Sequence, residues 1–498
     1  MQRFVKINSD DNVAVALTDL KSGEQLKVAG KTVTLKEDIT MGHKFALKDI
    51  AEGENIIKYG FPIGHALCAV AQGAHIHVHN LKTNLSDNLA YAFQPNHAKK
   101  APFTPKEEES FFMGYERADG KVGVRNELWI IPTVGCVNAV AREIEQRSQD
   151  LKSDKIENVV AFSHPYGCSQ MGDDQENTRE ALAALIKHPN AGGVLVLGLG
   201  CENSNIGILK DEGYLDGYDE SRVRFLQCQD CEDEVGEGIN ILRELAANAE
   251  KFERKRIGVE KLIVGMKCGG SDGLSGITAN PVVGRFSDML VAAGGSTILT
   301  EVPEMFGAET ILMERCINEE IFNKTVRLIN DFKDYFRQHD QTIYENPSPG
   351  NKKGGISTLE DKALGCTQKS GLGPVEDVLK YAESLKNRGL NLLSAPGNDL
   401  VASTATVLSG AQIVLFTTGR GTPFASAVPT VKISSNSRLA GHKNNWIDFD
   451  AGRLIEGKSL DELGEELYRE VIAVASGKKV KSEDGFRDLA IFKKGVTL

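Results

Sequence analysis

The sequence predicts an α/β protein of several domains, in which a small, mostly β module precedes two α/β domains with mainly parallel sheets. The chain has 498 residues, which is enough for roughly three domains. Short alternating segments with many turn residues fill the first part, whereas from Gly114 apolar strand-like runs alternate with amphipathic helix-like stretches, as in βα units. We therefore expect the β module over residues 1–97, a linker over 98–113, a central domain over 114–256 and a C-terminal domain over 257–498.

Short strands separated by turn residues make up the expected β module. We expect strands at residues 12–17, 25–28, 31–35, 55–58 and 75–79. The pairs Ser22-Gly23, Ala29-Gly30 and Glu52-Gly53 mark turns between them. The stretch from Lys99 to Glu109 is rich in Pro, Lys and Glu, which is the composition of a linker.

Strand and helix patterns alternate through the rest of the chain. We expect strands at residues 128–131, 159–162, 194–199, 223–226, 262–265, 391–394, 411–416 and 431–434. We expect helices at residues 138–147, 177–188, 232–246 and 459–476. The charged stretch 249–256 is expected to be helical and to close the central domain, and the polar stretch 346–355 is expected to be a loop.

Charge and composition narrow the partners of the chain. The formal net charge of −11 disfavours nucleic acid and anionic membranes, and the longest apolar runs are strand-sized. The N-terminus lacks the apolar core of a signal peptide, and nine cysteines in such a chain indicate free thiols in a reducing compartment. We expect a cytoplasmic homo-oligomer that acts on a small molecule.

Cysteines recur just after the expected strands. Cys136, Cys168, Cys201, Cys228 and Cys268 each follow one, most of them beside a glycine. In open α/β sheets ligands bind at the carboxyl ends of the strands, so these cysteines mark a candidate binding edge. Small residues that merely fit tight turns would give the same pattern. An iron–sulfur cluster is disfavoured, because only residues 228–231 form a Cys-x-x-Cys pair and the other spacings match no compact cluster motif.

The alternating triplet His75, His77 and His79 is a candidate metal site. Residues two apart on a strand share one face and lie about 6.6–6.8 Å apart, so two neighbouring imidazoles can converge on one ion. Neutral imidazole suits iron, manganese and zinc. A solvent-facing strand, or a polar face that contacts substrate, explains the same pattern.

Two glycine-rich loops after expected strands resemble anion-binding loops. The first runs from Lys267 to Gly276, where backbone amides and the lysine could hold a carboxylate. It lacks the Gly-Lys-Ser/Thr ending of a nucleotide phosphate loop. The second contains Arg420. The candidate substrate-binding residues are Lys267, Gly269, Gly270, Ser271 and Arg420. Plain glycine-rich turns are the alternative interpretation.

A charged stretch over residues 114–126 precedes a strand that has the pattern of a buried one. An exposed hairpin explains these charges. Alternatively, Arg125 could bind a substrate carboxylate, because the planar guanidinium can donate two parallel hydrogen bonds to it.

Several longer segments resemble the altronate and galactarate dehydratase family across nearly the whole chain. They are Gly42–Leu47, Ile57–Gly64, His75–Asn80, Gly114–Asn126, Thr133–Asn138, His164–Gln170 and Lys267–Asp272. The β module resembles a SAF domain, which has a β-clip fold. The close match of the first ninety or so residues is nearer to the altronate branch of the family than to the galactarate branch.

The resemblance implies loss of water from D-altronate to give 2-dehydro-3-deoxy-D-gluconate in bacterial hexuronate (galacturonate) catabolism, with iron(II) or manganese(II) as cofactor. Such a reaction removes the proton at C2 and protonates the departing hydroxyl, while positive charge stabilises the enediolate. The candidates for proton transfer are His43, Lys44 and His164. The candidate metal ligands are His75, His77 and His79, and the candidates for the carboxylate are Lys267 and Arg125.

Two other functions fit the same residues. One is galactarate dehydration or another 2-hydroxy-acid lyase reaction, such as that of a sulfolactate sulfo-lyase, although that enzyme is split into two chains. The other is a sugar-acid-binding protein without catalytic activity.

Overall fold

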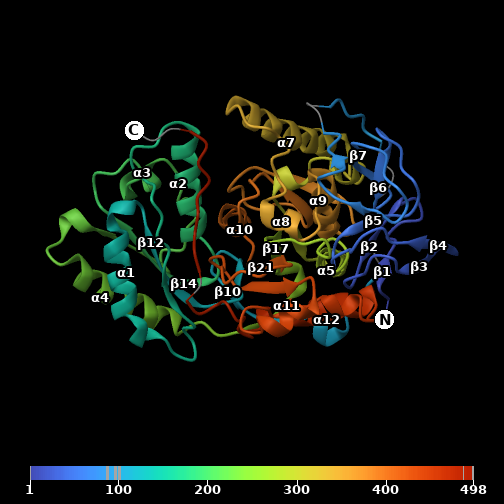
Figure 1. Ribbon diagram of the computed structural model, residues 1–498. Coiled ribbons are helices and arrows are strands. Elements are labelled where there is room, and N and C mark those ends of the chain that lie inside the picture. The colour runs from blue at the N-terminus through green and yellow to red at the C-terminus, as the bar shows by residue number, and fades with distance from the viewer. Residues whose placement is uncertain (1, 86–88, 95–97, 99–101, 486, 496–498) are drawn as a thin grey trace.

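The computed structural model describes residues 2–85, 89–94, 98, 102–485 and 487–495. The expected boundary at residue 97 and the expected linker residues Lys99 and Lys100 lie outside the described residues. The described chain forms three bodies (Figure 1): the β module in blue at one end, the C-terminal domain in the middle and the central domain in green at the other end. None of the helices described here has the length and apolar composition needed to cross a lipid bilayer.

The β module consists of short antiparallel strands in separate small sheets. One sheet has the order β1 (Phe4–Val5), β2 (Val13–Ala16), β5 (Lys44–Ala46) and β8 (His75–Ile76). The others are β3 (Gln25–Val28) with β4 (Lys31–Thr34), and β6 (Asn55–Lys58), β7 (Phe61–Ala66) and β9 (Leu81–Lys82). The first four expected strands are confirmed.

The strand expected over residues 75–79 is too long, because the regular strand ends at Ile76. Asn80 explains the early end. Its side chain accepts a hydrogen bond from the His77 backbone N–H (3.0 Å) and donates one to the His75 carbonyl (2.9 Å). The resulting turn places His77 and His79 around His75 instead of along one flat face.

The central domain is a parallel sheet with helices on both faces. The strand order is β13 (Val159–Ala161), β12 (Glu127–Pro132), β14 (Ala191–Gly198) and β15 (Val223–Gln227). The helices are α1 (Asn138–Arg147), α2 (Asp173–Ile186), α3 (Ile206–Asp211) and α4 (Glu234–Ala249). Every residue of β12 and β14 is buried, as expected for parallel strands covered on both faces. Leu128 and Leu195 pack under α1 and α4, whereas Trp129 and Val196 pack toward α2.

The helix expected over residues 249–256 is wrong. Helix α4 ends at Ala249, whose carbonyl accepts a hydrogen bond from the side chain of Asn126 (3.0 Å). The chain then forms β16 (Lys255–Gly258), which pairs antiparallel with β10 (Phe111–Glu116). Backbone pairing with β10 therefore replaces helical hydrogen bonds. The expected hairpin is present, because β10 also pairs with β11 (Val122–Gly123).

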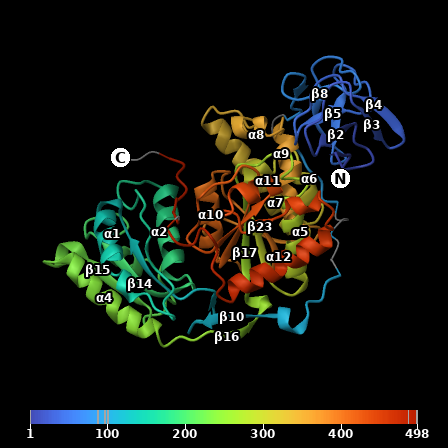
Figure 2. The same cartoon turned by 60° about the horizontal axis from the view of Figure 1, so that its bottom comes forward.

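The C-terminal domain is built on a seven-stranded parallel sheet. Its order is β19 (Val375–Leu379), β20 (Gly389–Leu393), β18 (Ser296–Leu299), β17 (Ile263–Cys268), β21 (Ile413–Thr418), β22 (Thr430–Ser434) and β23 (Phe449–Asp450). The helices are α5 (Ala279–Ala292), α6 (Glu309–Met313), α7 (Glu319–Gln338), α8 (Pro349–Lys353), α9 (Leu359–Cys366), α10 (Asp399–Leu408), α11 (Ser437–His442) and α12 (Leu460–Ala475). The expected loop at residues 346–355 contains α8, a helix of one to two turns. Figure 2 shows the β module beside α8 and α9.

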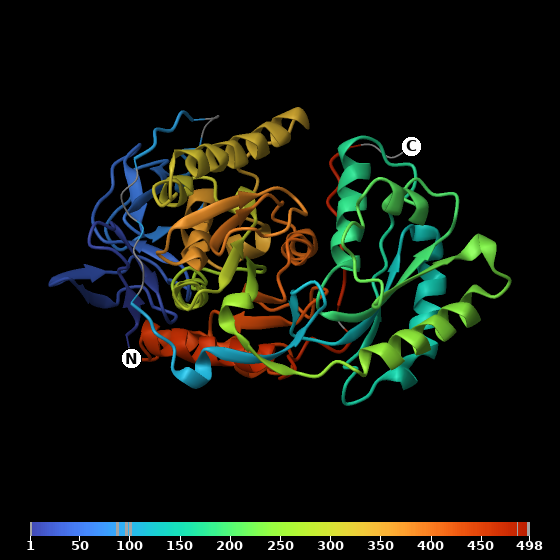
Figure 3. The same ribbon diagram turned by 180° about the vertical axis from the view of Figure 1, so that it is seen from behind.

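The two α/β domains are joined closely. A single buried apolar cluster includes Trp129 of the central sheet and Met266 of the C-terminal sheet. The antiparallel pair of β10 and β16 runs between the domains, as Figure 3 shows from behind. The last part of the chain returns to the central domain, where Arg487 makes two 2.7 Å hydrogen bonds to the Glu127 carboxylate.

Candidate active site

The two glycine-rich loops predicted to bind substrate lie side by side at the carboxyl edge of the C-terminal sheet. Strands β17 and β21 are neighbours, and Cys268 is paired with Thr417 at their ends. The backbone N–H groups of Gly419 and Arg420 both donate to the Gly270 carbonyl at 3.1 Å. The structure thus brings five predicted residues to one edge: Lys267, Gly269, Gly270, Ser271 and Arg420.

Lys267 lies at the base of this edge and is fully buried. Its ammonium is 2.6 Å from Asp399 and 3.1 Å from Glu301. Burial lowers the pKa of Lys267, but the two carboxylates outweigh that effect and raise it. The residue is therefore a fixed cation at neutral pH.

The side chain of Ser271 is available to a ligand. Its hydroxyl is buried and has no hydrogen-bond partner, although its carbonyl accepts from the Asn351 side chain (2.8 Å). The next residue, Asp272, is fixed by hydrogen bonds from the hydroxyls of Ser275 (2.8 Å) and Ser435 (2.8 Å). A rigid loop with one unsatisfied hydroxyl suits a ligand that offers hydroxyl or carboxylate oxygens.

Four histidines of the β module form a compact group. The Nδ1 atom of His43 is 3.0 Å from Nε2 of His75, and the His43 ring centroid is 5.1 Å from both His75 and His77. The His79 ring is 5.5 Å from His75. Burial, followed by the neighbouring cationic groups, lowers the pKa of His75 to about 3 and that of His77 to about 4. These imidazoles are neutral at physiological pH and can accept a proton or bind a metal ion.

The histidine group faces the C-terminal domain across a very close backbone contact. The His43 ring lies 3.3 Å from the Lys353 carbonyl. A Cβ atom added at Gly273 would lie 2.0 Å from the carbonyl oxygen of Gly42, and one added at Gly355 would lie 2.3 Å from it. Only glycine fits there, so these residues allow the β module to contact the loop that follows Ser271.

Lys44, predicted for proton transfer, is wholly buried in this contact. Its ammonium is 2.8 Å from the Asp361 carboxylate and 2.8 Å from the Gly355 carbonyl. The other oxygen of Asp361 is 2.8 Å from Lys58. Burial lowers the pKa of Lys44 to about 8, against the opposing effect of Asp361. These contacts give Lys44 an anchoring position between the two domains.

A second cluster, which the sequence analysis did not find, lies at the end of β17. Cys268, Glu304 and Cys366 are buried, with all three ligand atoms within 4.8 Å of one another. Among the His, Cys, Asp and Glu side chains of the described part of the chain, no other group of three is this compact. A hydrogen bond with Cys366, helped by nearby lysines, lowers the pKa of the Cys268 thiol to about 6. Of these three residues only Cys268 could be singled out from the sequence, because it follows an expected strand.

Arg125 and His164 lie in the central domain instead, each with its polar atoms engaged. The five donor positions of the Arg125 guanidinium bond to the Glu483 carboxylate and to the carbonyls of Val124, Val474 and Lys478. The His164 ring bonds to the Pro132 carbonyl (2.7 Å) and accepts from the Tyr166 N–H (3.2 Å). Arg125 thus joins the central domain to the C-terminal domain, and His164 holds a loop of the central domain; neither residue is part of the cluster around Lys267.

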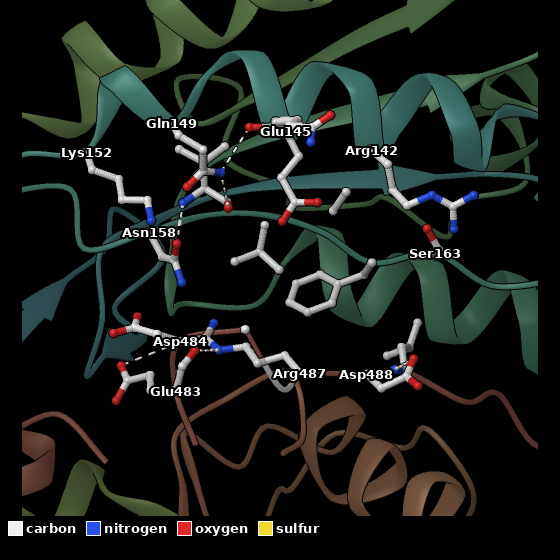
Figure 4. Close-up of a pocket in the computed structure, with 17 residues that line it drawn as sticks. Arg142, Glu145, Gln149, Lys152, Asn158, Ser163, Glu483, Asp484, Arg487 and Asp488 are labelled. Carbon is white, nitrogen blue, oxygen red and sulfur yellow. Dashed lines mark hydrogen bonds and ion pairs between the residues drawn. The ribbon is translucent and has the colours of Figure 1, made fainter. Parts of the chain in front are cut away.

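A separate pocket of about 830 Å³ lies between α1 and the returning C-terminal segment (Figure 4). Its lining mixes charges such as Arg142, Glu145 and Asp488, and it contains none of the predicted site residues. The guanidinium of Arg487, which points into this region, is neutralised by Glu127 and Glu483. We therefore place the candidate site at the C-terminal sheet.

Three family models match the chain in succession. The altronate/galactarate dehydratase SAF domain matches residues 2–84. The second domain of D-galactarate dehydratase/altronate hydrolase matches residues 114–250, and the C-terminal domain of D-galactarate/altronate dehydratase matches residues 259–497. The first match confirms the SAF-type fold expected for the β module.

Full-length relatives give the same result. The chain is 56% identical over 502 residues to altronate dehydratase of Bacillus subtilis (strain 168), with 100% of both chains covered. It is 54% identical over 499 residues to altronate dehydratase of Escherichia coli (strain K12), again with 100% of both covered. Galactarate dehydratase (L-threo-forming) of E. coli is 34% identical over 516 residues, covering 98% of this chain and 96% of the relative.

Proposed function

The chain belongs to the D-galactarate/altronate dehydratase family, and from that premise we propose that it removes water from D-altronate to give 2-dehydro-3-deoxy-D-gluconate. It is a hydro-lyase. The choice of substrate rests on sequence identity over the full length. The chain is 56% and 54% identical to two altronate dehydratases but 34% identical to a galactarate dehydratase.

The geometry of the edge of β17 supports this reaction. The sugar-acid carboxylate is assigned to the backbone N–H groups of Gly270 and Ser271, because the Gly269 N–H donates to the Thr417 carbonyl (3.0 Å) and the Lys267 ammonium is paired with Asp399 and Glu301. The unsatisfied Ser271 hydroxyl binds a substrate oxygen. The neutral His43, hydrogen-bonded to His75, takes the C2 proton. The proton that His43 takes from C2 is then returned to the departing 3-hydroxyl by the same imidazole, which acts first as base and then as acid.

A divalent cation, iron(II) or manganese(II), belongs to this proposal. When bound, it supplies positive charge beside the carboxylate as the enediolate forms. His75, His77 and His79 are its proposed ligands, supported by the ring contacts of His75 with His77 (5.6 Å) and His79 (5.5 Å) and by the lowered pKa of His75 and His77. Replacing His75 or His77 with Ala is expected to abolish metal retention by the purified protein, and normal occupancy would reject these ligands.

We also propose that the enzyme is a cytoplasmic homo-oligomer in hexuronate catabolism. All nine cysteines lie within the described residues and all are free, which supports a reducing compartment.

A direct assay tests the proposed reaction. The purified protein is incubated with iron(II), a reductant and D-altronate, and 2-keto-acid formation is followed. We expect turnover of D-altronate with little or none of galactarate. Activity on galactarate alone would reassign the substrate, and measurable binding of hexonates without turnover would favour a binding protein.

A further inference from the structure

We infer that Cys268, Glu304 and Cys366 form a binding site for one thiophilic divalent cation, separate from the histidine group. The residues come from three elements that the fold brings together: the end of β17, the end of the 3-10 helix Val302–Glu304 and the end of α9. Cation binding here does not require the proposed reaction to be correct, since it is measured without substrate.

The distances suit metal coordination. The two Sγ atoms are 3.5 Å apart, and each is 3.1 Å from the same oxygen, Oε2 of Glu304. Two sulfurs that bind one tetrahedral ion at about 2.3 Å lie about 3.8 Å from each other. Side chains at these separations reach an ion with small rotations. Three protein ligands also match catalytic centres, in which a further position is left for water or substrate.

The surrounding side chains fix the orientation of these ligands. Oε1 of Glu304 is 2.7 Å from the Lys362 ammonium, which leaves Oε2 directed at the thiols. Lys362 is itself held by the side chains of Asn346 (3.1 Å) and Asn351 (3.3 Å). Such outer contacts are typical of metal sites, where they set the direction and basicity of each ligand.

The backbone before Glu304 supports the same interpretation. Glu301 has a left-handed conformation (φ 69°), which is strained for a residue with a side chain. Contacts of the Glu301 side chain stabilise this conformation. Its carboxylate accepts a hydrogen bond from the Cys268 N–H (2.9 Å) and lies 3.1 Å from the Lys267 ammonium. Glu301 thereby links the start of the 3-10 helix to the end of β17 and brings Glu304 to the thiols.

A purely structural role explains the cluster less well. Buried charges are seldom more stabilising than apolar residues of similar volume, so an ion network by itself gives little reason for two adjacent thiols.

The chemistry of the two thiolates and the carboxylate indicates which metals would bind. Thiolates are soft ligands that favour iron, cobalt or zinc over manganese, magnesium or calcium. The site is also next to the proposed substrate loop, because Cys268 lies between Lys267 and Gly269. The cluster therefore favours a cation such as iron(II), cobalt(II) or zinc(II) over manganese(II).

Cobalt(II) substitution tests the site without any activity measurement. The full-length protein is stripped with a chelator, titrated anaerobically with Co²⁺ and followed by absorption. We expect a sulfur-to-cobalt charge-transfer band that saturates at one equivalent. Cys268→Ser and Cys366→Ser should abolish the band, and Glu304→Gln should weaken binding by about tenfold or more.

Two controls separate this site from other ligands. Cys316→Ser changes a buried cysteine of the same domain, 3.3 Å from the Thr325 hydroxyl, and should keep the band. His77→Ala should keep it too. Absence of the band in the wild-type protein would overturn the inference, and this result does not depend on the folding of any variant. A band that survives in both Cys268→Ser and Cys366→Ser would also overturn it. A band without turnover on D-altronate would leave this site standing and reject the proposed reaction.

Discussion

Asp361 is the carboxylate on which the β module is anchored to the C-terminal domain. Its side chain is fully buried and accepts from Lys44 and Lys58, both at 2.8 Å, and from the Ser357 N–H at 3.0 Å. The two lysines hold the pKa of this carboxyl below its usual range despite burial. Because Lys44 follows His43 directly, the ion pair also fixes the position of the histidine group.

Breaking this pair should destabilise the β module. In Lys44→Met the Asp361 carboxylate keeps Lys58 but loses one buried partner, so we expect a cost of about 3 kcal/mol in the free energy of unfolding. Lys48→Met is the matched control, because Lys48 is exposed and its ion pair with Glu54 contributes about 0–1 kcal/mol. Thermal unfolding measures both, and equal midpoints for the two variants would contradict the anchoring role.

His188 is a second buried residue with a measurable consequence. Its ring is bonded to the Ala411 carbonyl (3.2 Å), accepts from the Asn190 N–H (3.2 Å) and stacks on Trp129. Burial lowers the pKa of His188 to about 3. The unfolded chain therefore binds a proton below about pH 6.5 that the folded chain does not bind, and stability is lost as pH falls toward 3.

The pH dependence of stability tests this assignment. At pH 5 the proton that only the unfolded chain binds at His188 should remove about 2 kcal/mol of the stability present at pH 7. His188→Gln does not titrate, so its unfolding midpoint should fall less between pH 7 and pH 5 than that of the wild type. Parallel pH profiles for the two proteins would show that His188 does not contribute.

At the scale of elements, the contact between two turns positions the histidine group next to the Lys267–Ser271 loop. The turn at Gly42 comes from the β module, and the turn at Gly273 follows the Lys267–Ser271 loop. Their backbones are in direct contact, with no room for a Cβ atom at Gly273.

Gly273→Ala should disturb this contact without unfolding the domain. The new methyl group would lie 2.0 Å from the Gly42 carbonyl, which pushes the two turns apart. A shift of about 1 Å between reacting groups can reduce turnover by about a hundredfold, and we expect a loss of that order in kcat. Gly441→Ala is the control, because no atom lies within 4 Å of its added Cβ. Normal turnover by Gly273→Ala would separate this contact from catalysis.

The sequence predicted the elements whose patterns are local. Strands such as β12 and β14 were found because they are continuous apolar runs bounded by turns. Helix α5 was missed because it is buried on most sides and lacks a polar face, whereas α7 is strongly amphipathic and could have been predicted. The end of β8 depends on a side-chain hydrogen bond of Asn80, which no periodicity reveals.

Only the part of the candidate site that lies within a single loop could be predicted from the sequence. The residues after Lys267 stand together in the sequence, so a strand followed by glycines identifies them. Glu304 and Cys366 lie 36 and 98 positions after Cys268, and only the folded sheet brings them together. Arg125 illustrates the converse, because a charged residue next to a strand can serve the contact between domains instead of a substrate.

At the scale of the whole molecule, the three bodies have different relations to the proposed site. The C-terminal domain supplies the sheet edge, the β module supplies the histidines beside it, and the central domain lies on the other side of the C-terminal domain (Figure 1). The central sheet has its own carboxyl edge with Cys136, Cys168 and Cys201 exposed. The molecule therefore has two sheet edges that could bind substrate, and we place the site at the edge of the C-terminal sheet.

A crystal structure with iron(II) and the product 2-dehydro-3-deoxy-D-gluconate tests that choice most directly. We expect the product carboxylate at the Gly270–Ser271 backbone, with His43 facing the carbon chain. Product bound at the central edge beside Cys168 and Cys201, or in the pocket of Figure 4, would contradict it.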